Sequence, residues 1–279
     1  MTAPYGERLT AAVGERGALC VGVDPHPGLL DRWDLPRDAA GLERFARGVV
    51  AALAETVAVF KPQSAFFEAY GSAGIAVLEL VLADIAQAGA ISLLDVKRGD
   101  IGSTMDAYAA AYLADGSTLA ADAITVSPYL GVETFAATAD LAEKHGRGVY
   151  VLALTSNPEA PAQQQARTAA GLSVAETVLD WAAARNTGAV PLGSVGLVVG
   201  ATIEPPDLDF TRLNGSILAP GVGAQGGEPE HLPAIFGAAT PLVLPSASRE
   251  VLAAGPDPDA LRRVAKSLAD RSNAARTTP

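Results

Sequence analysis

A short charged segment, Asp95-Val96-Lys97-Arg98-Gly99-Asp100, directly follows an apolar run near the middle of the chain. If that run, residues 90–94, is a β-strand, Asp95 and Lys97 lie two residues apart and point to the same face. A carboxylate and an ammonium at a strand end are costly to desolvate unless they pair or take part in chemistry. Such a pair can deliver a proton to a substrate and repel an anionic group on it. A solvated ion pair is the ordinary interpretation of an isolated Asp-x-Lys.

The rest of the chain alternates between short apolar runs and longer amphipathic segments. Near-continuous apolarity is typical of parallel strands that are covered on both faces. The predicted strands are residues 18–23, 57–60, 90–94, 121–126, 148–154, 195–199, 216–219 and 242–244. The predicted helices are residues 41–55, 73–88, 103–113, 132–144, 172–185, 206–213, 230–236 and 259–272.

This alternation predicts an α/β fold, a (β/α)₈ TIM barrel that forms a single domain over residues 1–279. A polar stretch over residues 272–279 is expected to be a frayed tail. A doubly wound open sheet is the alternative, but no Gly-x-Gly-x-x-Gly motif follows the first predicted strand.

Charged residues lie at the predicted carboxyl ends of successive strands, where such barrels collect their reactive groups. Asp24 follows the first strand and Lys61 the second, while Asp95 and Lys97 follow the third. Each has an ordinary interpretation, such as a turn cap for Asp24 or a solvated strand-end lysine for Lys61. Their occurrence at successive strand ends favours a functional site, and we expect all four at one mouth of the barrel.

Two further segments favour a phosphate site. Residues 220–227 follow the seventh predicted strand, are dense in glycine and contain Gln225, and Arg249 follows the eighth strand. Backbone N–H groups of such a loop and a guanidinium suit a phosphate at this place in a barrel. Residues 155–170 are expected to form a long polar loop after the fifth strand.

Composition narrows the class of protein. The chain has 279 residues, 49% of them hydrophobic, and a net charge of −11, which argues against a nucleic-acid partner. It has no apolar stretch of transmembrane length and no secretory signal pattern, so no membrane association is expected. The single cysteine, Cys20, favours a reducing, cytoplasmic location. His26, His145 and His231 are scattered, so we expect no metal site.

Residues 95–104 match the D-x-K-x-x-D-I-x-x-T signature of the orotidine 5′-phosphate decarboxylase family. Segments 22–27, 60–63, 126–131, 219–226 and 246–249 also resemble that family, in the family's order. The resemblance is to the longer bacterial subgroup and extends from about Gly17 to Glu250. Metal-dependent sugar-phosphate enzymes share the Asp-x-Lys-x-x-Asp core, and Arg98, Ile101 and Thr104 make the match specific.

The resemblance implies conversion of orotidine 5′-monophosphate to uridine 5′-monophosphate (UMP) and CO₂, the last step of de novo pyrimidine biosynthesis. It implies no metal and no organic cofactor, and a homodimer with shared active sites. Lys97 resembles the proton donor to C6 of the pyrimidine, and Asp95 the carboxylate beside the leaving group. Lys61 resembles the lysine that links Asp95 to the ribose hydroxyls.

The remaining residues implied by the resemblance bind substrate or lie at the subunit boundary. They are Asp24 at the ribose, Asp100 with Ile101 and Thr104 reaching the neighbouring subunit's site, Ser127 at the pyrimidine edge, and Gln225 with Arg249 at the phosphate. The loop around Gln225 matches a closing lid. Where short family members carry Gly-Arg before the last helix, this chain has Ser248-Arg249.

Three other functions are possible on sequence grounds. A metal-dependent sugar-phosphate decarboxylase or aldolase would need Mg²⁺ at the strand ends. A catalytically inactive phosphate-binding barrel with a regulatory role is disfavoured, because it would not need both Lys61 and Lys97. One half of a bifunctional uridylate synthase is disfavoured because no phosphoribosyltransferase domain fits in the remaining residues. The spacing of Met105, Tyr108 and Tyr112 on one helix favours packing or a subunit contact.

Overall fold

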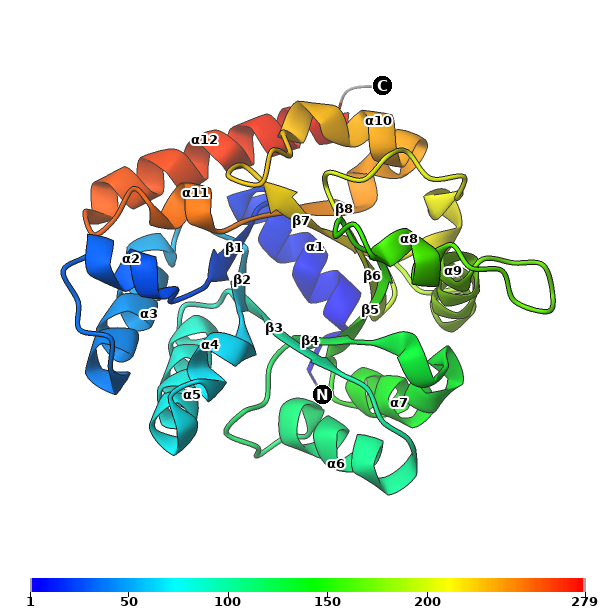
Figure 1. Ribbon diagram of the computed structural model, residues 1–279, viewed down its shortest axis with the longest axis horizontal. Coiled ribbons are helices and arrows are strands. Elements are labelled where there is room, and N and C mark those ends of the chain that lie inside the picture. Colours follow the sequence, from blue (N-terminus) through cyan, green and yellow to red (C-terminus); the bar gives the residue numbers. More distant parts are fainter. Residues whose placement is uncertain (1, 278–279) are drawn as a thin grey trace.

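The computed structural model describes residues 2–277 and contains eight parallel strands that close into one barrel (Figure 1). Each strand pairs with its neighbours along the chain, and β8 closes the ring against β1. The strands are β1 Cys20–Val23, β2 Val59–Pro62, β3 Ile91–Arg98, β4 Ala123–Val126, β5 Gly148–Leu154, β6 Val195–Val199, β7 Ile217–Val222 and β8 Val243–Ala247. All eight predicted strands are present, and the predicted (β/α)₈ barrel is confirmed.

Helices cover this ring, most of them on its outer side (Figure 1). They are α1 Tyr5–Arg16, α2 Pro27–Arg32, α3 Ala39–Leu53, α4 Ser64–Glu68, α5 Gly71–Gln87, α6 Gly102–Leu113, α7 Ala136–Lys144, α8 Ala160–Gln164, α9 Val174–Arg185, α10 Leu232–Phe236, α11 Arg249–Leu252 and α12 Pro258–Thr277. Buried apolar side chains between strands and helices form the larger part of the core. Because both faces of the strands are covered, their near-continuous apolarity is explained.

The sequence analysis expected no element before residue 18, whereas α1 closes one end of the barrel. Its buried residues Tyr5, Leu9 and Ala12 follow a helical spacing and pack with the inward-facing side chains of the strands. The Tyr5 hydroxyl lies 3.0 Å from that of Tyr150 in the barrel interior. Arg8 pairs with Asp122, just before β4, which places α1 at the amino ends of the strands. The opposite, carboxyl end is therefore the open one.

The segment between β6 and β7 differs from the sequence prediction. A helix was expected over residues 206–213, but the described structure has only the 3₁₀ turn η3, Phe210–Leu213, there. Pro205 and Pro206 each lack an N–H donor, and Asn214 takes a left-handed backbone with φ of 46° that ends the turn. The crossover from β6 to β7 therefore contains a 3₁₀ turn in place of the expected helix.

Two further predictions are corrected at other places in the chain. The polar loop after β5 contains the short helix α8. The last helix was expected to end at Ser272 before a frayed tail, but α12 continues to Thr277, and residues 278–279 lie outside the described residues. Ser272 is fully buried, so the helix keeps its contact with the core at that point.

The aromatic face of α6 packs inside its own subunit. Met105 and Tyr112 are buried in the outer core, and Tyr108 packs against it. The packing interpretation of these three residues is therefore confirmed. Among the described residues, no helix combines the length and the apolar character that crossing a membrane requires.

Candidate active site

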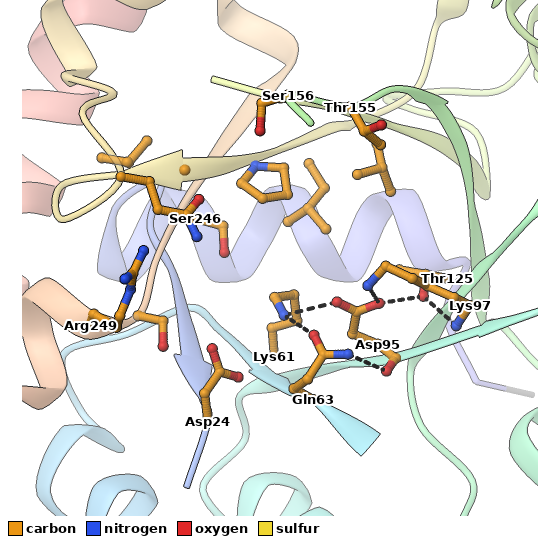
Figure 2. A pocket seen from close by; sticks show the side chains of 18 of the residues that line it. Asp24, Lys61, Gln63, Asp95, Lys97, Thr125, Thr155, Ser156, Ser246 and Arg249 are labelled. Carbon is orange, nitrogen blue, oxygen red and sulfur yellow. Dashed lines mark hydrogen bonds and ion pairs between the residues drawn. The ribbon is translucent and has the colours of Figure 1, made fainter. Parts of the chain in front are cut away.

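A cavity of about 560 Å³ opens at the carboxyl ends of the strands. Asp24, Lys61, Asp95 and Lys97 all line it, as the sequence predicted (Figure 2). They come from β1, β2 and β3, which are neighbours in the barrel. Short parallel strands in register therefore bring together residues that are far apart in the chain.

Asp95 is the centre of the charged group. Its Oδ2 accepts a hydrogen bond from Lys61 Nζ at 3.1 Å, and its Oδ1 accepts one from Lys97 Nζ at 2.6 Å. The Asp95 and Lys61 side chains are only 8% and 7% exposed, whereas Lys97 is 46% exposed. One carboxylate thus joins a buried lysine to a lysine that reaches the open cavity.

The charges of this group hold one another in place. Burial favours the neutral acid at Asp95, but the Lys61 and Lys97 ammoniums outweigh it and hold the pKa of Asp95 well below its usual range. Burial alone would lower the pKa of Lys61, but the carboxylates of Asp95 and Asp24 raise it above its ordinary value. We conclude that Asp95 and Lys61 both carry their charge at neutral pH.

The backbone of β3 is irregular where it carries these groups. Leu94 pairs with Ile124 and Arg98 pairs with Val126, so the ladder with β4 shifts register between them. Within this bulge Lys97 has a φ of 45°, in the left-handed region that costs a side-chain-bearing residue about 1–2 kcal/mol. Strain of this kind collects at functional sites, where it re-aims a side chain.

Asp24 lies after β1, and the close approach of β8 to this part of the chain depends on a glycine. A Cβ at Gly22 would lie 2.7 Å from Ser248 Cβ and 3.0 Å from Asp24 Oδ2, so a larger residue there would collide with the pocket wall. Asp24 Oδ1 and Ser248 Oγ are buried and have no hydrogen-bond partner among the described residues. A bound ligand with hydroxyl groups can satisfy both atoms.

Gln225 and Arg249, the two residues expected at a phosphate, both lie at the cavity. Figure 2 shows Arg249 on a different side of it from the Lys61–Asp95–Lys97 group. The Arg249 side chain forms no ion pair or hydrogen bond with another described residue. The Gly221 backbone has a φ of 110°, which lets the loop turn tightly before Gln225.

Four predicted site residues do not line this cavity. Ser127 follows β4, but its backbone N–H bonds to the Arg98 carbonyl at 2.8 Å and the residue stays outside the pocket. The role implied for Ser127 at the pyrimidine edge is therefore not supported by its position. Asp100, Ile101 and Thr104 also lie outside their own subunit's pocket, and Ile101 is 62% exposed.

Sequence reasoning missed several polar residues of the pocket. Thr155 and Ser156 follow β5 and lie across the cavity from Asp95 in Figure 2. Lys61 was identified as a charged residue at the end of a predicted strand, and polar residues at the end of the fifth strand could have been identified in the same way. Gln63 accepts from Lys61 Nζ at 3.4 Å and donates to the Asp95 carbonyl at 3.4 Å. His26 also lines the pocket.

Asp95→Asn is expected to destabilise the protein in a pH-dependent way. The lowered pKa of Asp95 means that its stabilising effect is present above about pH 4, the unfolded value, and is lost as pH falls below it. At pH 7 the variant leaves two lysines without their carboxylate, which we expect to cost about 3 kcal/mol or more.

Denaturant unfolding of both proteins from pH 7 to pH 3 measures this difference. The free-energy gap should narrow below about pH 4, because Asp95 takes up a proton in the unfolded wild-type chain while it stays ionised in the folded protein. Asp106→Asn, at an exposed position of α6, is the matched control and should show no such trend. A gap that stays constant over the whole range would contradict the assignment of Asp95 as the charged centre.

Comparison with known proteins identifies the family. A model of the Orotidine 5′-phosphate decarboxylase / HUMPS family matches residues 17–264. An orotidine 5′-phosphate decarboxylase of Salinispora arenicola is 60% identical over 267 residues, 95% of this chain and 96% of the relative. One from Streptomyces coelicolor is 53% identical over 266 residues, again 95% and 96% of the two chains.

Solved structures give the same result. A structure from Streptomyces avermitilis superposes with a TM-score of 0.95 at 54% identity, covering 99% of this chain and 97% of that one. The UMP synthase of Leishmania donovani matches with a TM-score of 0.77 at 33% identity, and this chain spans 57% of that longer protein. On the family match, the near full-length identity and the shared fold, this chain belongs to the orotidine 5′-phosphate decarboxylase family.

Proposed function

We propose that this protein decarboxylates orotidine 5′-monophosphate to UMP and CO₂, the last step of de novo pyrimidine biosynthesis. The observation that carries the proposal is the Lys61–Asp95–Lys97 array in a cavity whose other side presents Arg249. The names of the relatives at 60% and 53% identity support the same activity.

The charged array fits the chemistry of this reaction. When the bond between C6 and the carboxylate breaks, CO₂ leaves and the electron pair stays on C6 until a proton arrives. The Lys97 ammonium, which reaches the cavity, is the group assigned to that proton. Asp95 stays ionised and repels the substrate carboxylate, while Lys97 stabilises the developing carbanion. These charges are fixed before reaction, so the protein pays little to reorganise them in the transition state.

Binding of the nucleotide is assigned to the remaining walls of the pocket. Arg249 and Gln225 are placed at the phosphate, and Asp24 with its unpartnered Oδ1 is placed at the ribose hydroxyls. Ser156, which lines the cavity opposite Asp95, takes the place of Ser127 at the pyrimidine edge. Energy from the distant phosphate contacts can then be used to hold the ring against the charged array.

The metal-dependent sugar-phosphate enzyme remains the second candidate from the sequence. In this chain both oxygens of Asp95 accept hydrogen bonds from ammonium or hydroxyl donors, which favours a site that works through proton donors. Within residues 2–277 no three His, Cys, Asp or Glu side chains come together in a group that could hold a metal ion. We therefore propose that the reaction proceeds without a metal ion and, as the family resemblance implies, without an organic cofactor.

A homodimer with shared active sites is part of the proposal. The loop after β3 and the start of α6 place Asp100, Ile101 and Thr104 outside their own pocket, where they can reach a second copy. The neighbouring loop after β4 exposes Tyr129 by 78% and Leu130 by 49%. A second copy that covered these exposed apolar side chains would remove them from water. With the single buried Cys20, we place the dimer in the cytoplasm.

Purified protein should convert orotidine 5′-monophosphate to UMP, and a chelator should leave the rate unchanged. Lys97→Ala should abolish turnover while UMP still binds, because no other ammonium faces the open cavity from the same strand end. Single-turnover decarboxylation and UMP affinity measure the two effects. Lys266→Ala, an exposed lysine on α12, is the control. Retention of most of the rate by Lys97→Ala would remove this lysine from the mechanism.

Arg249→Ala should weaken binding of UMP far more than binding of uridine. A charge-assisted contact to phosphate is worth about 1.5–3 kcal/mol, roughly 10- to 150-fold in affinity. Calorimetric titration of both ligands measures the difference, with the exposed Arg263→Ala on α12 as control. Equal losses for nucleotide and nucleoside would show that Arg249 does not face the phosphate.

Mixed dimers of two inactive variants test the shared sites. If Asp100 completes the partner's site, a dimer of one Lys97→Ala subunit and one Asp100→Ala subunit has one site with both residues lost and one with both intact. Activity should therefore reappear when the two variants are mixed, at up to about half of the wild-type value per mixed dimer, since two-fold symmetry makes the wild-type sites equivalent. Mixed dimers that form but stay inactive would place Asp100 in its own subunit's site.

A further inference from the structure

Thr125 occupies a special position opposite the charged segment of β3. Three residues, Asp95, Val96 and Lys97, lie between the paired positions Leu94 and Arg98, whereas β4 has only Thr125 between their partners. The ladder between the two strands is therefore interrupted there. Thr125 is 1% exposed and lines the cavity, and its side chain fills the interruption (Figure 2).

The hydroxyl of Thr125 makes two bonds whose directions are fixed. The Lys97 backbone N–H donates to Thr125 Oγ1 at 3.0 Å, so this oxygen acts as an acceptor. Thr125 Oγ1 then donates its proton to Asp95 Oδ1 at 2.7 Å, because an ionised carboxylate only accepts. One hydroxyl thus satisfies a backbone donor of the bulge and holds a carboxylate oxygen at the same time.

We propose that Thr125 is a positioning residue that sets the orientation of both Asp95 and Lys97 for decarboxylation, an inference that rests on the proposed function. Asp95 Oδ1 is bound by both Thr125 and Lys97 Nζ, so the direction of this carboxylate determines where the ammonium lies. The N–H bond also supports the left-handed backbone at Lys97, which has a φ of 45°.

Removal of the hydroxyl has a specific consequence. Valine has nearly the shape of threonine but offers neither donor nor acceptor, so the Lys97 N–H would lose its partner and Asp95 would lose one of three donors. The carboxylate can then rotate, and it carries Lys97 Nζ with it. Misplacement of reacting groups by a fraction of an ångström lowers the rate of the chemical step more than it lowers ligand binding.

Thr125→Val and Thr125→Ser test the proposal together. In Thr125→Val we expect kcat to fall by about 10- to 100-fold, the effect of one lost charge-assisted hydrogen bond, while KM and UMP affinity change less than about threefold. Thr125→Ser keeps the hydroxyl and should restore kcat to within about threefold of wild type. If Thr125→Val does not fold, Thr125→Ala is compared with Thr125→Ser in its place.

Thr138→Val is the matched control. Thr138 on α7 is also 1% exposed, but its Oγ1 has no hydrogen-bond partner among the described residues and it lies outside the pocket. This variant should keep the wild-type kcat and melting temperature. A merely structural role of Thr125 would lower the melting temperature and leave kcat of the folded protein unchanged, and that result would overturn the proposal.

A crystal structure of Thr125→Val separates this inference from the proposed function. If wild-type protein does not decarboxylate orotidine 5′-monophosphate, the proposed function is wrong, whatever Thr125 does. The positions of Asp95 and Lys97 in the variant then decide the inference on their own. Displaced Asp95 and Lys97 side chains support it, and side chains that superpose on those of the wild type overturn it.

Discussion

The site depends on one buried carboxylate that two ammoniums hold ionised. Asp95 has an 8% exposed side chain, and a charge in such a place is stable only with close partners. Lys61, equally buried, needs Asp95 for the same reason. Each of these two buried charges would be strongly destabilising without the other. Strands β2 and β3 must therefore lie side by side in the register that they have. The barrel closure that fixes this register is thus a requirement of the chemistry as well as of the fold.

The geometry of Asp95 and Lys97 was only partly predictable from the sequence. The alternation of side chains along a strand predicted that both would face the same way, and the two groups do meet at 2.6 Å. The reason is different from the expected one. Lys97 belongs to a bulge with a left-handed backbone, and the ladder resumes only at Arg98. A bulge of this kind depends on what the next strand offers, so residues 95–97 alone do not reveal it.

The strands were predictable because strands that are buried on both faces consist almost entirely of apolar residues. The sequence contains no comparable signal for residues whose role depends on their place in the folded structure. Thr125 is one more β-branched residue in a strand, and only its place opposite the bulge makes it important. Ser127 and Ser156 both follow strands, but the Ser127 backbone bonds to Arg98 while Ser156 faces the cavity. The helix α1 was missed although Tyr5, Leu9 and Ala12 have helical spacing, because no strand precedes it in the alternating pattern.

The two ends of the pocket differ in how completely their polar groups are paired within the protein. At the end near Asp95 nearly every charge is neutralised by a neighbour, so little reorganisation is left for the reaction itself. At the other end Arg249, Asp24 Oδ1 and Ser248 Oγ have no partner among the described residues. Asp24 Oδ1 and Ser248 Oγ are already shielded from water, so a ligand hydroxyl that reaches them gains a hydrogen bond without displacing another. We propose that this end holds the phosphate and hydroxyls of the substrate, which brings the reacting ring against the charged group around Asp95.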